Sequence, residues 1–457
     1  MEASLYEIAQ VVGAKNNIEV FDDFKVNNIE FDSRKIEFDD LFLPLQGERD
    51  GHDFITTAFK NGAGATFSEK ELDNESPYIL VDNCLEAFQI LAKYYLEKIA
   101  VDVIAVTGSN GKTTTKDMIA SILASKYKTY KTQGNYNNEI GLPYTALHMP
   151  SDTEKIVLEM GQDHMGDIHL LSEIAQPKIS VVTLIGESHI EFFGSRENIA
   201  KGKMQIADGM PEGGTLIVPA DKIINKFLPD NQKIVRFGAD QDIHITNLFE
   251  HKDYLTFETN FLDYDLSVPL PGRFNATNAM LAACVGKLMG VDDASIKKSL
   301  SETSITKNRT EWLKAENGAD ILSDVYNANP TAMRLILETF QEIPKNEGGR
   351  KLVVLADMKE LGENSSDFHA QMITAINPEK IDKLYLYGEE MEALVKYAQD
   401  MFPKGSLRFY RKDADIDELE ALKKDVKEDL QASDQILLKG SNSMQLSKLV
   451  DELEARG

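Results

Sequence analysis

The sequence predicts an α/β protein of three domains, with parallel sheets in its central and C-terminal parts. Its 457 residues are too many for one ordinary core, because domains mostly hold about 100 to 200 residues. From residue 100 onward, short apolar runs alternate with helical patterns, as in βαβ units. We place the domains at residues 1–99, 100–313 and 314–457.

The N-terminal domain is expected to be a small α/β unit. Short strands and helices alternate there around turn-rich stretches such as residues 47–51. Residues 83–98 are predicted as a helix, because Leu85, Phe88 and Leu96 recur at helical spacing with Leu91 between them. This helix should lead into the central domain.

The central domain is predicted around a buried parallel sheet. Residues 101–106 are apolar apart from one Asp, which suits a strand buried on both faces. Residues 113–125 then carry apolar side chains on one helical side. Further short strands are predicted at residues 156–159, 179–184 and 215–219.

The C-terminal domain repeats this alternation and is predicted as a smaller, Rossmann-like unit. The expected strands are residues 321–325, 352–356, 383–387 and 435–438, with helices at 331–340 and 391–401 between them. The charged stretch 423–429 is expected to be a solvated helix face.

Composition narrows the functional classes. Lys and Arg number 49 and Asp and Glu 75, a formal charge of −26. Such a surface repels phosphate backbones and anionic membranes, so we expect neither nucleic acid nor a membrane as partner. No apolar run approaches the roughly 18 residues of a membrane span, and the N-terminus lacks the pattern of a signal peptide. The two cysteines are far apart and predict no disulfide scaffold. We expect a cytoplasmic protein, and a monomer.

The strongest motif is VTGSNGKTTT at residues 106–115, between an apolar strand and an amphipathic helix. Glycines let backbone N–H groups approach phosphate oxygens, Lys112 can reach the β- and γ-phosphates, and the Thr113 hydroxyl suits Mg²⁺. Val106 stands where the usual pattern has its first glycine, and a chance Gly-rich turn is the alternative. The predicted ATP-binding residues are Thr107, Gly108, Ser109, Asn110, Gly111, Lys112, Thr113 and Thr114. A kinase, a motor, a switch or a ligase could use such a loop.

Three later side chains are candidates for metal chemistry. Glu159 ends a predicted parallel strand, a good position for a Mg²⁺ ligand beside the phosphate loop. His189 follows another strand, and Lys203 lies in a helical stretch. Taken singly, each also has an ordinary interpretation: a surface Glu, a structural His and a solvated Lys.

Four features, in this order along the chain, resemble the Mur ligases and folylpolyglutamate synthases. They are TGSNGKTTT, LEMG at 158–161, a His after a strand, and AKGK at 200–203. Later stretches extend the resemblance over the whole chain: GRFNATN at 272–278, NRTE at 308–311 and DVYNANP at 324–330. The resemblance implies an ATP-dependent ligase that joins a carboxylate to an amine.

Four stretches are similar to the branch that adds D-alanyl-D-alanine to UDP-N-acetylmuramoyl-tripeptide in peptidoglycan precursor synthesis. They are FDSR at 31–34, TQGNYNN at 132–138, LADMKELG at 355–362 and LKGSNSM at 438–444. The resemblance implies these two substrates and an acyl-phosphate intermediate. The alternatives are the branch adding the third peptide residue, a folylpolyglutamate synthase, and a P-loop ATPase or nucleotide-gated binding protein.

The resemblance also implies roles for single residues. Lys112 and Arg309 contact ATP phosphates, and Thr113, Glu159, His189 and Lys203 hold two Mg²⁺ ions, with Lys203 carbamylated by CO₂. Lys112, Lys203, His189 and Arg309 are the implied catalytic set. Asn278 contacts adenine and Asp324 the ribose; Ser33 and Arg34 hold the UDP end; Asn135, Asn138, Tyr326, Asn327 and Asn329 contact substrate.

Two positions need comment. Asn327 stands where many relatives have a histidine, which removes a proton-transfer group. Lys201 competes with Lys203 for the carbamate, and Lys203 is chosen because the family pattern places Ile206 three positions after it. A hinge is expected at residues 309–314.

Overall fold

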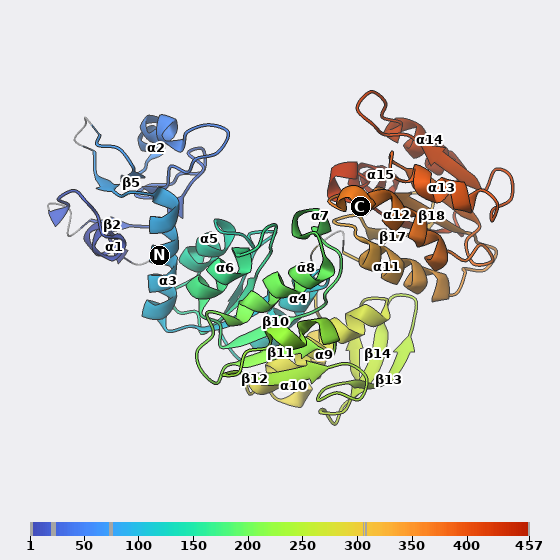
Figure 1. The fold of residues 1–457 in the computed structure, drawn as a ribbon, viewed down its shortest axis with the longest axis horizontal. Coiled ribbons are helices and arrows are strands. Elements are labelled where there is room, and N and C mark those ends of the chain that lie inside the picture. Colours follow the sequence, from blue (N-terminus) through green and yellow to red (C-terminus); the bar gives the residue numbers. More distant parts are fainter. Residues whose placement is uncertain (1–2, 20–23, 73–75, 305, 307–308, 456–457) are drawn as a thin grey trace.

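The computed structural model describes residues 3–19, 24–72, 76–304, 306 and 309–455. Three α/β units follow one another along the molecule, from the blue N-terminal unit through the green and yellow central unit to the orange C-terminal unit (Figure 1). The predicted α/β class with parallel sheets is confirmed. Within the described ranges, no helix is both long and apolar enough to cross a membrane.

The N-terminal unit holds a parallel sheet in the order β3-β4-β5-β6 and a small antiparallel pair, β1-β2. Its strands are β1 (Ala3–Ser4), β2 (Lys25–Val26), β3 (Ile29–Glu30), β4 (Leu41–Phe42), β5 (Ala65–Ser68) and β6 (Tyr78–Leu80), and its helices α1 (Leu5–Val12), η2 (Gly51–Phe54) and α2 (Ile55–Asn61). Most of these strands are too short to leave a clear apolar period in the sequence.

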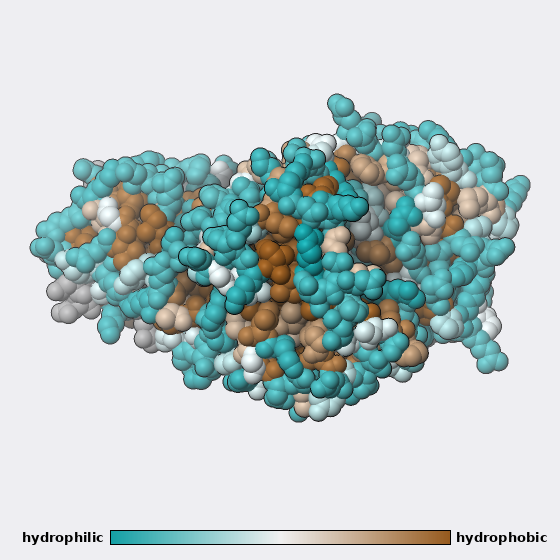
Figure 2. Space-filling view, turned by 60° about the horizontal axis from the view of Figure 1, so that its bottom comes forward, coloured by the Kyte–Doolittle hydropathy of each residue, from teal (hydrophilic) through white to brown (hydrophobic). Residues whose placement is uncertain are grey.

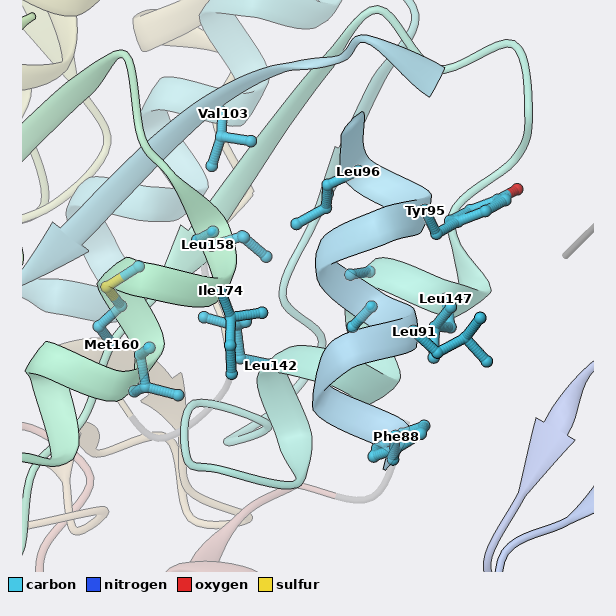
Figure 3. Packing of buried hydrophobic residues seen from close by; sticks show 14 of the residues in the cluster. Phe88, Leu91, Tyr95, Leu96, Val103, Leu142, Leu147, Leu158, Met160 and Ile174 are labelled. Carbon is cyan, nitrogen blue, oxygen red and sulfur yellow. The ribbon is translucent and has the colours of Figure 1, made fainter. Parts of the chain in front are cut away.

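Helix α3 (Cys84–Ile99) joins this unit to the central one and matches the predicted helix. Asn83 caps its start by accepting a hydrogen bond from Glu86 N at 3.0 Å. Its apolar face, including Leu91 and Leu96, packs beside α5 (Gly141–His148) and α6 (Asp167–Ala175) (Figure 3). One buried cluster therefore runs from the N-terminal unit into the central one.

The central unit is built on six parallel strands in the order β12-β11-β10-β7-β9-β8. They are β7 (Asp102–Thr107), β8 (Thr129–Lys131), β9 (Lys155–Glu159), β10 (Ile179–Val182), β11 (Thr215–Pro219) and β12 (Lys233–Phe237). The helices are α4 (Lys112–Ala124), α5, α6, α7 (Ile190–Phe193), α8 (Arg196–Met204), η3 (Gln205–Ala207), η4 (Lys222–Phe227), α9 (Arg273–Leu288) and α10 (Asp293–Ser301).

The strand predicted at 179–184 ends two residues early, at Val182. The reason is local: the carbonyl of Leu184 accepts a hydrogen bond from Ser109 N at 2.8 Å, so the chain leaves the sheet to follow the phosphate loop.

An antiparallel sheet, β13-β14-β15, was missed by the sequence interpretation. Its strands are β13 (Ile245–Glu250), β14 (Leu255–Thr259) and β15 (Leu266–Val268). β13 is half-exposed along its length, so its residues carry little apolar patterning. The view in Figure 2 likewise shows mostly hydrophilic side chains, with hydrophobic ones gathered in hollows.

The C-terminal sheet has the order β16-β17-β21-β18-β19-β20, with β16 antiparallel and the other strands parallel. Its strands are β16 (Glu311–Lys314), β17 (Asp320–Asp324), β18 (Lys351–Ala356), β19 (Lys383–Tyr387), β20 (Leu407–Tyr410) and β21 (Gln435–Lys439). The helices are α11 (Pro330–Glu342), η5 (Gly362–Asn364), α12 (Ser365–Gln371), η6 (Met372–Ala375), α13 (Glu392–Ala398), α14 (Leu419–Asp429), η7 (Asn442–Met444) and α15 (Ser447–Leu453).

Two helical segments predicted in this unit have other bounds in the structure. The helix expected at 391–401 spans only α13, and the charged stretch 423–429 is the second half of α14, whose Leu422 and Val426 are buried.

β21 inserts between β17 and β18, which brings the carboxyl ends of all three strands together. The domain boundaries at 99/100 and 313/314 stay a prediction.

Candidate active site

A cleft lies between the central and C-terminal units. Among the predicted site residues, those that line it are Ser109, Asn110, Gly111, Lys112, Thr113, Thr114, Asn135, Glu159, His189, Lys203, Asn278, Arg309, Asp324, Tyr326 and Asn327. The phosphate loop at 106–115 and the C-terminal DVYNANP stretch at 324–330 therefore meet at one site, although they lie more than 200 residues apart in sequence.

The phosphate loop turns from β7 into α4 and depends on two glycines. Gly108 has φ +150°, and a Cβ there would overlap the Thr183 hydroxyl; Gly111 has φ +81°, and its Cβ would overlap the Asn278 side chain. Larger residues would be strained in these conformations and would collide. The loop therefore presents its backbone and the start of α4 to the cleft, the arrangement that binds phosphate.

Lys112 begins α4 and turns back over the loop, where its Nζ donates to Gly108 O at 2.9 Å. Burial lowers the pKa of Lys112, and the carboxylate of Glu159 opposes this shift. A phosphate group in the loop would supply the negative charge that this partly buried ammonium needs.

Thr113 and Glu159 form the centre of the predicted metal site. The Thr113 hydroxyl donates to Glu159 Oε2 at 2.9 Å, and Asn137 Nδ2 donates to Glu159 Oε1 at 2.8 Å. Glu159 is only 2% exposed and ends β9, next to β7 in the sheet. The buried carboxylate is thus fixed against the loop with a hydroxyl beside it, both oxygen ligands of the kind Mg²⁺ takes.

Arg309 reaches the same hydroxyl from the segment that connects the two units. Its Nη2 donates to Thr113 Oγ1 at 3.2 Å, and its guanidinium carbon lies 3.9 Å from the ring centre of Tyr326. Arg309 Nε is buried and, within the described ranges, has no hydrogen-bond partner. A guanidinium with an unused donor in this place is suited to a phosphate oxygen. Asn308 of the same motif lies outside the described residues.

His189 precedes α7 with a left-handed backbone, φ +62°. Its Nδ1 lies 2.6 Å from Glu360 Oε2, on the loop after β18, and 3.5 Å from Asp163 Oδ1. This close contact with the imidazole lowers the pKa of Glu360. His189 thus lines the cleft while touching a carboxylate of the C-terminal unit.

Lys203 is 1% exposed at the end of α8, whereas Lys201 is exposed. Burial lowers the pKa of Lys203 well below its usual value, and the charge of Lys112 lowers it further. In the part of the chain that the structure describes, no carboxylate forms an ion pair with Lys203. A lowered pKa favours the neutral amine, which is the form that adds CO₂. The geometry favours Lys203 over Lys201 as the carbamate candidate.

The residues expected at the nucleoside end also lie in the cleft. Asn278, in α9, donates from Nδ2 to Asn275 Oδ1 at 3.3 Å, next to Gly111. Asp324 ends β17 and forms an ion pair with Lys439 at 2.6 Å. Among the described residues, no three His, Cys, Asp or Glu side chains form a metal-binding group, so Mg²⁺ would rely on mixed ligands.

Other predicted residues lie elsewhere. Thr107 is buried under the loop, where its hydroxyl donates to Met160 O at 2.8 Å. Asn138 caps the start of α5 by accepting from Gly141 N at 2.9 Å, and the neighbouring Asn135 lines the cleft instead. Asn329 caps α11 and donates to Asn110 Oδ1 at 2.8 Å, so it holds the C-terminal unit against the loop.

Ser33 and Arg34 lie in the N-terminal unit, away from this cleft. Arg34 is largely exposed and pairs with Asp32 at 2.8 Å, which lowers the pKa of Asp32 to about 2. The carbonyl of Ser33 accepts from Asn61 Nδ2 at 2.7 Å. Their role toward the UDP end stays a prediction.

Among the residues not singled out from the sequence, Asn137 and Lys439 line the cleft and Glu360 contacts His189. Each lies inside a stretch that carried the resemblance, TQGNYNN, LADMKELG and LKGSNSM respectively. Membership of these motifs was the one feature of the sequence that could have pointed to the three residues. Which of its members faces the cleft depends on contacts between distant segments, and no local pattern encodes those.

The phosphate loop, the carboxylate beside it and the bridging arginine define a nucleotide-dependent phosphoryl-transfer enzyme that works between two α/β units. Residues 106–286 match the Mur ligase middle domain, and residues 308–442 the Mur ligase, glutamate ligase domain. The chain belongs to the Mur ligase family.

Individual relatives of this family match the chain over nearly its whole length. The UDP-N-acetylmuramoyl-tripeptide–D-alanyl-D-alanine ligase of Bacillus subtilis is 38% identical over 94% of this chain and 93% of its own. A crystal structure of MurF from Acinetobacter baumannii superposes with a TM-score of 0.89 at 28% identity, covering 99% of both chains. MurF ligase from Thermotoga maritima, solved in complex with ADP, gives a TM-score of 0.81 at 29% identity, over 93% of this chain and 97% of that one.

Proposed function

We propose that this chain joins the C-terminal carboxylate of UDP-N-acetylmuramoyl-tripeptide to the amine of D-alanyl-D-alanine, with hydrolysis of ATP, in cytoplasmic peptidoglycan precursor synthesis. The observation that carries the proposal is the contact between Thr113 and Glu159 at 2.9 Å, beside a buried Lys203. Full-length similarity to ligases of this name supports the choice of substrates.

The reaction has to convert a poor electrophile into a good one. A carboxylate would have to expel oxide, whereas an acyl phosphate expels phosphate. Transfer of the γ-phosphoryl group of ATP to the tripeptide carboxylate therefore comes first. The amine of D-alanyl-D-alanine then attacks the acyl carbon, and the tetrahedral intermediate releases phosphate.

We assign the residues of the chain to separate tasks in these reaction steps. Lys112 and the loop N–H groups hold the β- and γ-phosphates, and Arg309 offsets charge on the transferred group. We assign Asn278 to the adenine and Asp324 to the ribose, since both line the cleft. Asn327 carries no ring nitrogen, so it can orient a substrate by hydrogen bonds but cannot act as a general base.

Mg²⁺ fits the residues present. Thr113 and Glu159 offer oxygen ligands, His189 a nitrogen, and Lys203 becomes an anionic oxygen ligand if its neutral amine takes up CO₂. Two ions of this kind would neutralise phosphate charge and orient the γ-phosphoryl group.

Water must be kept from an acyl phosphate, and the contacts between the units are suited to that. Asn329 donates to both Asn110 Oδ1 at 2.8 Å and Ser188 Oγ at 2.7 Å, and the Thr331 hydroxyl donates to Glu187 at 2.6 Å. These bonds hold α11 of the C-terminal unit over the phosphate loop. We propose that the segment 309–314 is the hinge of this closure and that the enzyme works as a monomer.

Phosphate release from ATP tests the proposal. The purified protein is assayed with Mg²⁺ and UDP-N-acetylmuramoyl-tripeptide, with and without D-alanyl-D-alanine, using tripeptides that end in lysine or in diaminopimelate. Release that needs both substrates, together with the pentapeptide product by mass spectrometry, is the expected result.

The same assay separates the alternatives. Release without any acceptor indicates a simple ATPase. Release with a UDP-dipeptide plus lysine or diaminopimelate indicates the third-residue ligase, and release with a folate plus glutamate indicates a folylpolyglutamate synthase. Any of these results in place of the expected one contradicts the proposal.

A further inference from the structure

Lys439 is a buried lysine in the cleft that has no role in the reaction as described so far. It ends β21, is 2% exposed, and lies directly opposite Asp324 in the pairing of β17 with β21. Its Nζ donates to Asp324 Oδ2 at 2.6 Å and to the carbonyl of Asn327 at 2.6 Å. One ammonium therefore anchors both ends of the segment 324–327.

Tyr326 lies between these two anchors, and its ring supports Arg309 at 3.9 Å. Arg309 in turn donates to the Thr113 hydroxyl at 3.2 Å. A continuous line of contacts thus runs from the C-terminal sheet to the first turn of the phosphate-loop helix. The short segment that carries Tyr326 is a loop between β17 and α11, and loops are more mobile than the elements they connect.

We propose that Lys439 is a positioning residue for phosphoryl transfer: it holds Tyr326 beneath Arg309, so that the guanidinium stays aimed at the phosphates. The inference rests on the proposed function and adds to it a residue that acts without touching the reacting atoms. A misplaced guanidinium slows the chemical step. Binding of the UDP end should stay unchanged, because Ser33 and Arg34, the residues assigned to it, lie in the N-terminal unit away from this segment.

The chain offers a close control in Lys351. This lysine is also 2% exposed, and it lies in β18 of the same sheet. Its Nζ donates to backbone carbonyls at the end of α11, among them Gln341 O at 3.0 Å. Lys351 is not among the residues that line the cleft. A purely structural effect of losing a buried lysine should appear equally in both positions.

The test uses the full chain with K439M, K439R and K351M, measuring kcat, each KM and the melting temperature. We expect K439M to lower kcat about 10- to 100-fold, the scale of a misaligned catalytic group, with KM for the UDP-tripeptide within about twofold of the parent value. K439R should recover most of the loss. K351M should lower the melting temperature with kcat unchanged.

A double variant shows whether the effect passes through Tyr326. If it does, K439M/Y326A is no slower than Y326A alone, because the two changes break the same line of contacts. Losses that multiply, or a K439M enzyme with the parent's kcat, overturn the inference while leaving the proposed function intact. If K439M does not fold, K439Q is compared with K351Q in the same way. A parent enzyme without acceptor-dependent phosphate release would instead refute the function itself.

Discussion

Lys203 shares its cleft with Lys112, and the pKa of the Lys203 amine is lowered well below its usual value, by burial first and by the Lys112 charge second. Two lysines in one cleft would repel each other if both were charged. Phosphate can compensate Lys112, and CO₂ can convert Lys203 into an anion. Under the proposed function, the pair would then give one cationic and one anionic lysine in the loaded site.

The first prediction concerns pH. Because the pKa of Lys203 is lowered, its amine loses its proton at a lower pH than an ordinary lysine does, so its carbamate should rise less steeply with pH between pH 7.5 and 9. An ordinary lysine would gain about tenfold neutral amine per pH unit over this range. Carbamate should be lost only as pH falls through the lowered pKa. Carbon-13 NMR at a constant concentration of labelled bicarbonate measures it, because a neutral amine and bicarbonate give carbamate and water with no net proton released; a tenfold rise per pH unit would then contradict the assignment.

The second prediction separates Lys203 from its neighbour. Lys203→Ala should remove most activity, and short carboxylic acids or bicarbonate should restore part of it, because a small anion can enter the space left by the side chain and supply the missing oxygen ligand. Lys201→Ala is the matched control, since Lys201 is exposed on the same helix and should be dispensable. Full activity of Lys203→Ala without additives would exclude the carbamate at that position.

The third prediction concerns the phosphate loop. Lys112→Ala should lower kcat by at least about 100-fold, the usual cost of removing one fixed charge or donor from a transition state. The fold should persist, because among the described residues the Lys112 ammonium bonds only a carbonyl of its own loop. Phosphate release measures the loss of kcat, and circular dichroism checks that the fold persists. Turnover within tenfold of the parent would mean that the loop is not the phosphate site.

Local patterns predicted the parts of this molecule that are encoded locally. The apolar strand before the phosphate loop, the glycines in it and the helix after it are contiguous, so the sequence was sufficient for β7 and α4. Thr215–Pro219 and Lys383–Tyr387 were predicted residue for residue, because buried parallel strands appear as unbroken apolar runs. The half-exposed β13 carries no such run and was missed.

Contacts between distant segments could not be predicted in the same way. Asn135 and Asn138 belong to one motif, but the turn into α5 directs one toward the cleft and uses the other as a helix cap. His189 and Glu360 meet only because the C-terminal unit docks on the central one. The motifs gave the list of candidates, and the tertiary structure decided which of them line the cleft.

The last prediction tests that docking contact. Glu360 belongs to the C-terminal unit, and its carboxylate lies 2.6 Å from His189 Nδ1, while its carbonyl accepts from Glu191 N at 3.1 Å. A carboxylate against one ring nitrogen favours the proton on that nitrogen and leaves the other free to bind a metal. Glu360→Ala should therefore raise the Mg²⁺ concentration needed for half-maximal activity, by about 10-fold or more.

Glu363 provides the control, three residues further along the same loop. It is exposed, and within the described ranges its carboxylate makes no ion pair, so Glu363→Ala removes an equal charge without touching His189. Manganese binding to the ADP complex, followed by electron paramagnetic resonance, gives a second readout that does not depend on turnover. If both variants shift the metal requirement equally, the effect is one of general charge. If only Glu360→Ala does, the C-terminal unit contributes to the metal site through His189.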